Sequence, residues 1–175
     1  MDESYTTFTY DANGNLIEFI VHSKGQNTNN FFAIKSVLTY NTDGTEVSKE
    51  QFTGNENMQT NPGLISTLFF ENEFIVREDF ANANFDTDYF YDTENGIYKN
   101  IPFMNIIHLV GRNYGGLEGG IHNLMRLESQ TGLITSLFVE SYTYTYNTQG
   151  YPETGTFFEA GFASQNLEYF YIPAP

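Results

Sequence analysis

The sequence predicts a mainly β fold, in which an antiparallel up-and-down meander forms one strongly curved sheet or a partly closed barrel. A strand-and-turn phrase recurs along the chain, apolar segments of strand length lie between its copies, and the 175 residues include 17 Phe and 13 Tyr. The two aromatic or apolar residues of the phrase are two positions apart, which on a strand places them on the same face. A two-layer sandwich is the alternative architecture. The length suits one domain, residues 1–175.

The recurring phrase has two aromatic or apolar residues flanking a small one, then Asp or Asn, a short gap and Gly. It occurs at Phe8–Gly14, Leu38–Gly44 and Tyr144–Gly150, with a looser copy at Tyr89–Gly96. Asp or Asn bonds the backbone of a turn, and Gly supplies the positive φ angle that closes it. We therefore expect four tight hairpins at unequal spacing.

Apolar segments between these copies supply the other strands. We expect a hairpin from Gly63–Phe70 into Phe74–Arg77, a second from Leu124–Glu128 into Leu133–Val139, and a last strand at Leu167–Ile172. The run Leu16–Val21 is apolar at five of six positions, so its pattern does not reveal which residues face inward. The whole chain is expected to hold about ten to twelve strands.

One segment departs from the two-residue period. Apolar residues recur at i, i+3, i+4 and i+7 between Pro102 and Gly111, at Phe103, Ile106, Ile107 and Val110. Pro just inside the start and Gly just past the end favour a short helix over about 102–110, with a buried strand as the alternative. Residues Lys24–Asn30 and Gly54–Gly63, which are rich in Asn, Gln, Thr and Gly, are expected to be loops.

Charge and composition exclude several classes of function. The chain has 22 acidic and 7 basic residues, a net charge of −15, so neutralising phosphates cannot drive nucleic-acid binding. No apolar run approaches the roughly 20 residues of a membrane-spanning helix. The start, Met1–Ser4, lacks the layout of a signal peptide, so no signal sequence is expected in this chain. There is no Cys and hence no disulfide.

The aromatic residues before the turns are the candidate binding residues. Tyr10, Tyr40, Tyr91 and Tyr146 occupy equivalent places in the four copies. Cross-strand packing of these rings is one interpretation. The other is a platform for a sugar or a protein, since Tyr combines a large apolar area with a polar tip.

The sequence offers no catalytic residues, no metal ligands and no cofactor motif. Asp11–Asn15 is too short for an EF-hand loop, and Asp86-Thr87-Asp88 is typical of a solvated strand edge, although an acidic calcium loop is the alternative. The three His show no metal-binding spacing, and Gly115–Gly120 lacks the Lys-Ser or Lys-Thr of a phosphate loop. These observations favour a binding protein over an enzyme.

Tyr10–Leu16 and Tyr146–Pro152 resemble the tyrosine–aspartate repeats of bacterial cell-surface shell proteins. The layout of the whole chain is more similar to a group of Bacteroides-type cell-envelope lipoproteins, a domain of unknown function with a porin-like, single-sheet fold. There, tyrosine–aspartate hairpins precede a short helix, and an Asn-Leu segment, here Asn123-Leu124, leads into the last hairpins. The resemblance implies export, a lipid anchor in the full-length precursor, and a periplasmic or outer-membrane location. It supplies no catalytic residues.

The sequence thus predicts a non-catalytic, secreted or envelope-associated protein that binds an unidentified glycan, lipid or protein through its curved sheet face. Two alternatives remain at this point. One is a carbohydrate-active enzyme that uses paired carboxylates, since such chemistry needs only two suitably placed acids. The other is a lipocalin-like carrier with an apolar ligand in its interior.

Overall fold

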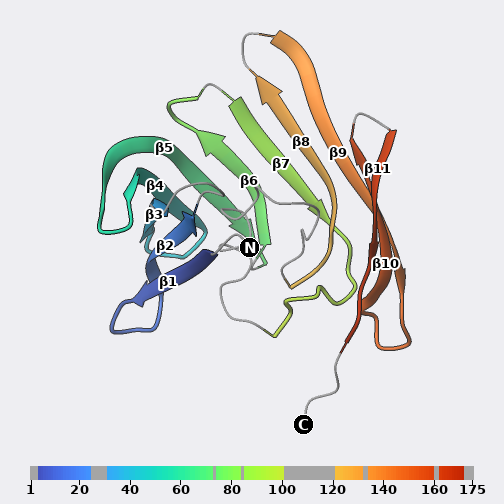
Figure 1. Ribbon diagram of the computed structural model, residues 1–175. Helices are drawn as coiled ribbons and strands as arrows, with labels where there is room; N and C mark the ends of the chain where they lie inside the picture. Colours follow the sequence, from blue (N-terminus) through green and yellow to red (C-terminus); the bar gives the residue numbers. More distant parts are fainter. Residues whose placement is uncertain are drawn as a thin grey trace. The chain divides into compact units, whose positions relative to one another are not determined.

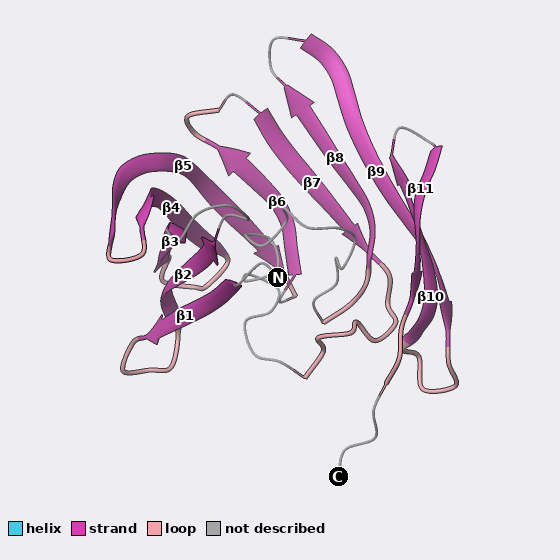
Figure 2. Cartoon of the chain, viewed as in Figure 1, coloured by secondary structure: helices cyan, strands magenta, loops and turns pink. Residues whose placement is uncertain are grey.

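The computed structural model describes residues 4–24, 31–72, 74–83, 85–100, 121–131, 134–159 and 162–171, which form strands and no helix (Figures 1 and 2). The strands are β1 (Ser4–Tyr10), β2 (Leu16–Lys24), β3 (Phe31–Tyr40), β4 (Glu46–Asn55), β5 (Met58–Glu71), β6 (Phe74–Phe80), β7 (Phe85–Tyr91), β8 (Leu124–Thr131), β9 (Ile134–Tyr146), β10 (Pro152–Glu159) and β11 (Phe162–Glu168). The mainly β prediction is confirmed. The helix predicted over about 102–110 lies outside the described residues.

The strands follow one another in space as they do in sequence. All eleven belong to one sheet with the order β1 to β11, and the strand pairs on either side of each turn are antiparallel. This confirms the predicted up-and-down meander. The alternative of a two-layer sandwich is wrong for the described strands, because they form a single sheet.

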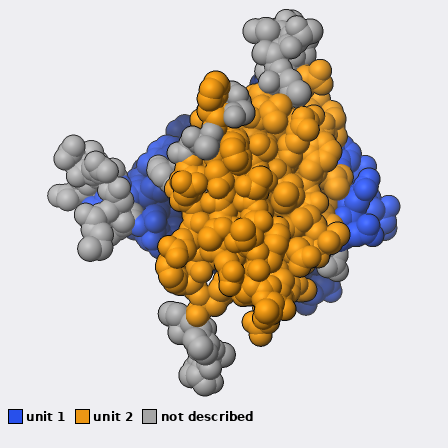
Figure 3. Space-filling view, turned by 90° about the vertical axis from the view of Figure 1, so that its right-hand side faces the viewer, with its two compact units in different colours: residues 1–72, 78–84 blue, residues 73–77, 85–175 orange. Residues whose placement is uncertain are grey.

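The chain divides into two compact units, coloured blue and orange in Figure 3. Unit 1 comprises residues 1–72 and 78–84, and unit 2 comprises residues 73–77 and 85–175. Strand β6 contributes residues to both. Whether residues 1–175 act as one domain stays a prediction.

A β-bulge decides which residues of the ambiguous run at the start of β2 are buried. Thr9 pairs with Glu18 and Tyr10 pairs with Leu16, so Ile17 is the extra residue. Because a bulge shifts the alternation by one residue, Leu16 and Phe19 are both buried, at 0% and 1% exposure. Neither of the two regular alternations could place both residues inward.

The same irregularity recurs at two other hairpins. Tyr91 pairs with Leu124, and Tyr146 pairs with Pro152, each next to a register shift. The first residue of the following strand is fully buried in all three cases: Leu16, Leu124 and Pro152. A tyrosine that ends one strand therefore faces a buried residue that begins the next.

The loop predicted at Gly54–Gly63 is wrong, because strands fill most of that segment. β4 runs to Asn55 and β5 begins at Met58, leaving a turn of two residues. The Asn55 carboxamide oxygen accepts the backbone N–H groups of Asn57 and Met58 at 3.0 and 2.9 Å. Gln59 donates its side-chain amide back to the Asn55 carbonyl at 2.6 Å. The polar residues of this segment therefore close a short turn with their side chains and do not form a long loop.

Unit 1 contains a buried ion pair among its apolar side chains. Lys49 on β4 and Glu78 on β6 form a salt bridge, and their side chains are 4% and 3% exposed. Ser66 on β5, which lies opposite Lys49, donates its hydroxyl to the same Glu78 oxygen at 2.6 Å. One carboxylate thus links three neighbouring strands. The opposite charges of Lys49 and Glu78 compensate the cost of burying each other.

We predict that Glu78→Gln lowers the free energy of unfolding by about 3–5 kcal/mol, because it leaves the Lys49 charge buried without its counter-charge. Urea unfolding followed by circular dichroism measures this change. The matched control is Glu50→Gln on the exposed part of β4, which should cost less than about 0.5 kcal/mol. Equal losses in the two variants would contradict a buried pair.

Candidate ligand-binding site

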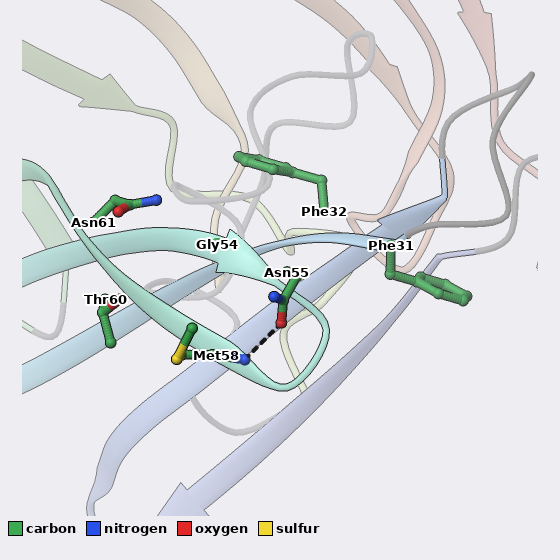
Figure 4. Close-up of a pocket in the computed structure, with 7 residues that line it drawn as sticks. All are labelled: Phe31, Phe32, Gly54, Asn55, Met58, Thr60 and Asn61. Carbon is green, nitrogen blue, oxygen red and sulfur yellow. Dashed lines mark hydrogen bonds between the residues drawn. The ribbon is translucent and has the colours of Figure 1, made fainter.

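A pocket of about 500 Å³ lies in unit 1, at the ends of β3, β4 and β5 (Figure 4). It is lined by Phe31, Phe32, Gly54, Asn55, Met58, Thr60 and Asn61. The pocket is open to solvent at one end of the sheet, and its lining mixes rings and a thioether with amides and a hydroxyl. Such a mixture is typical of small-ligand sites, in which apolar area supplies affinity and a few polar groups supply orientation.

The β4–β5 turn forms this pocket by bringing two strands unusually close together. A Cβ atom at Gly54 would lie 1.9 Å from the Met58 carbonyl oxygen, so a residue larger than glycine cannot occupy the position without moving the backbone. The register also shifts between Thr53 and Gly54. A bulge at this place redirects the side chains that follow it, including Thr60 and Asn61.

Phe32 and Asn61 project to one side of the strands, whereas Met58 and Thr60 project to the other (Figure 4). Phe32 is 52% exposed and Met58 is 59% exposed, which are high values for apolar side chains of that size. Among the described residues, the Asn61 carboxamide has no hydrogen-bond partner. The Phe32 ring and the Asn61 amide are thus both exposed on the same side of this end of unit 1 (Figure 4).

Phe31, by contrast, belongs to a packed cluster beside the pocket. Its ring lies edge-on to Tyr5 with 5.7 Å between centroids, and Lys24 lies over its face at 5.7 Å. Tyr5 also stacks on His22 at 4.2 Å and donates its hydroxyl to Glu56 at 3.0 Å. This cluster supports one wall of the pocket by fixing the start of β3 against β1 and the β4–β5 turn.

The structure places the four predicted tyrosines in two pairs, Tyr10 and Tyr40 in unit 1 and Tyr91 and Tyr146 in unit 2. None of the four lines the pocket described above. Tyr10 is 47% exposed, and Tyr91 packs on Phe74 with 5.6 Å between centroids. Ligand binding by these residues stays a prediction, while Tyr91 has a packing contact in the structure.

Tyrosine hydroxyls hold the buried strand starts in place. Tyr40 donates to the Leu16 carbonyl at 2.9 Å. Tyr144 donates to the Leu124 carbonyl at 3.1 Å, and Tyr171 donates to the Pro152 carbonyl at 2.8 Å. Each acceptor is the first residue of a strand, and the strand before it ends in a tyrosine. The bond satisfies a carbonyl beside the bulge, where the ladder of backbone bonds is interrupted.

Three of the predicted turns form with the expected chemistry. Gly14, Gly44 and Gly150 have φ angles of 86°, 75° and 76°. At the first turn, the Asp11 carboxylate accepts the backbone N–H groups of Asn13 and Asn15 at 2.9 and 2.8 Å. The side-chain hydrogen bond from Asn15, followed by these backbone bonds, lowers the pKa of Asp11. The carboxylate therefore stays ionised as it holds the turn.

The fourth predicted turn, at Tyr89–Gly96, is wrong in its extent. Asp92 accepts the N–H of Asn123 at 3.1 Å and its side-chain amide at 3.0 Å, as Asp11 does from Asn15. The Asp92 N–H in turn donates to the Asn123 carbonyl at 3.1 Å. The hairpin between β7 and β8 is thus the same turn, closed by a partner 31 positions along the chain. The two halves of this turn are therefore separated in sequence and joined by the contacts of Asp92 and Asn123.

Tyr146 also contacts Asp92 at this turn. Its hydroxyl donates to the second carboxylate oxygen of Asp92, the oxygen that Asn123 also contacts. Burial, followed by the hydrogen bond to Asp92 and its charge, holds the pKa of Tyr146 well above its usual value. The phenol therefore remains a donor at neutral pH. The predicted site residue Tyr146 acts as a structural clamp in the described residues.

The acids of Asp86-Thr87-Asp88 are engaged by an arginine. Arg77 donates to Asp86 at 2.8 Å and to Asp88 at 3.3 Å, and all three side chains are between 40% and 45% exposed. Among the described residues, no group of three or more His, Cys, Asp or Glu side chains could hold a metal ion. The described part of the chain also contains no helix long and apolar enough to cross a membrane.

Sequence reasoning missed Phe32, Met58 and Asn61 as functional candidates. Met58 and Asn61 fall in the segment expected to be a loop, and Phe32 follows the Asn-rich residues before β3. The available signal was the pair Phe31-Phe32 next to a polar segment. Adjacent side chains on a strand point to opposite faces, so one of the two rings must point away from the other. Comparisons with protein-family models, with curated proteins and with solved structures give no match for the chain.

The turns at Asp11 and Asp92, which make equivalent hydrogen bonds, provide a matched test of the Asp92 clamp. Asn123 is 2% exposed, whereas Asn15 makes the same contacts on the surface. We predict that Asn123→Ala lowers the free energy of unfolding by about 1–3 kcal/mol, because it removes the amide that donates to the Asp92 carboxylate and to the Asn95 carbonyl in a part-buried position. Asn15→Ala should cost about 0.5–1 kcal/mol. Chemical denaturation measures both values, and a larger loss at Asn15 would contradict the buried clamp.

Proposed function

We propose that the protein is a non-catalytic binding protein of the cell envelope that holds a neutral saccharide in the pocket at the ends of β3, β4 and β5. One observation carries this proposal: the half-exposed Phe32 ring and the Asn61 amide project to the same side of the sheet (Figure 4). A sugar ring offers an apolar face of C–H groups and a rim of hydroxyls. Phe32 suits the face, and Asn61 suits the hydroxyls, as donor and acceptor at once.

Charge and polarity favour a neutral saccharide over the other ligand classes. A net charge of −15 disfavours anionic ligands through long-range repulsion. A lipid tail would need a more continuous apolar surface than a lining that includes Asn55, Thr60 and Asn61 provides. The envelope location rests on the resemblance of the hairpin repeats to cell-surface proteins.

A carbohydrate-active enzyme is less well supported by the same structure. Glycoside hydrolysis needs one carboxyl group that holds a proton and a second that faces it across the bond. The paired acids Asp86 and Asp88 are instead both hydrogen-bonded to the same Arg77 side chain. The pocket lining in unit 1 contains no acidic residue. The observations therefore favour binding without catalysis.

Titration calorimetry with neutral gluco-, manno- and xylo-oligosaccharides tests the proposal. We expect one class to bind, and we expect Phe32→Ala and Asn61→Ala each to weaken binding by at least about tenfold, equivalent to about 1.4 kcal/mol. Phe90→Ala is the matched control, since this ring is 47% exposed in unit 2. No binding at millimolar saccharide, or equal weakening by Phe90→Ala, would refute a sugar site at Phe32.

A further inference from the structure

We propose that the outer edge of β1 binds an extended segment of a partner protein, which adds to the sheet as a further strand and carries Lys or Arg at its ends. β1 stands at one end of the strand order and pairs with β2 alone among the described strands. Its second edge therefore presents backbone N–H and C=O groups, which a strand can bind by the same ladder that joins β1 to β2.

The apolar face of unit 1 is incomplete at β1. Phe8 lies directly opposite Phe19, and Phe19 is 1% exposed while Phe8 is 41% exposed. Tyr5, three positions before Phe8 and so on the other face of β1, is 43% exposed although it contacts His22 and Phe31. A further strand beside β1 would cover Phe8 with its own side chain, as β1 covers Phe19. An incoming strand with alternate apolar residues fits this requirement.

β1 also lacks the features by which sheet edges usually avoid pairing. The segment Ser4–Tyr10 contains no charged residue, no Pro and no Gly, and consists of Ser, Thr, Tyr and Phe alone. Its register with β2 is regular from Ser4 to Thr9, with one shift at the end of the strand. Edges of this kind add strands readily, whereas protected edges carry Lys, Pro or bulges along their length.

Charge selects a basic partner over a second copy of this chain. Two acidic residues lie near the ends of β1: Asp11 follows the strand, and Glu56 accepts the hydroxyl of Tyr5 near its start. A second copy would bring the same acids and another net charge of −15. Lys or Arg at the ends of an incoming strand would instead face Asp11 and Glu56 with opposite charge.

The test uses a fluorescently labelled peptide of alternating Val and Thr with Lys at both ends, and measures its anisotropy with the intact protein. We expect saturable binding that weakens as salt is raised, and at least about tenfold weaker binding when Asp replaces the Lys residues. Two N-methylated peptides distinguish the edges of the added strand. Methylation of the N–H groups on one alternate set should abolish binding, and methylation of the other set should not.

Protein variants place the peptide on β1. Phe8→Lys should weaken binding at least about tenfold, whereas Phe162→Lys, which makes the same change at a ring that is 79% exposed on β11, should not. Absence of binding by the Lys-flanked peptide overturns the proposal, and so does equal loss with both methylated peptides. Concentration-dependent dimers of the intact protein that Phe8→Lys dissolves would assign the edge to a second copy and also overturn it.

Discussion

The hydrogen-bonded turn that joins a tyrosine-ended strand to a buried strand start constrains the rest of the meander. An Asp or Asn carboxyl or carboxamide oxygen accepts the N–H that opens the next strand, as at Asn15, Asn123 and Tyr151. The bulge that follows turns the first residue of that strand inward. A tyrosine hydroxyl from the next strand then bonds the carbonyl of this residue. Turn, register and burial are thereby set together, since a one-residue slip would expose the buried position.

Much of this fold could be predicted from the sequence, because its local chemistry is explicit. Asp11 to Gly14 and Asn147 to Gly150 close turns where their residue types require them. The burial of both Leu16 and Phe19 could not be predicted, because it depends on a bulge that leaves no mark in the apolar pattern. The partner of Asp92 could not be predicted either, because Asn123 is distant in sequence and contacts it only after folding.

The candidate site was less predictable than the fold, since it depends on which rings packing leaves exposed. The repeated tyrosines were the visible candidates, yet Tyr40 and Tyr146 use their hydroxyls to hold strands and turns. Phe32 and Phe8 are half exposed because they lie at the limits of the packed face of unit 1, at a strand start and at a sheet edge. The aromatic residues thus fall into two groups, those that hold strands and turns and those that stay exposed. The position of a residue along its strand decides its group.

Amide hydrogen exchange followed by NMR tests whether the turn and the strand start form one unit. We predict slow exchange at the backbone N–H groups of Asn15, Asn123 and Tyr151, which donate to the turn side chains at 2.8, 3.1 and 3.1 Å. Their protection should match that of the strands they open, because they would unfold in the same cooperative step. Exchange at unfolded-chain rates in these three amides, beside protected strands, would contradict it.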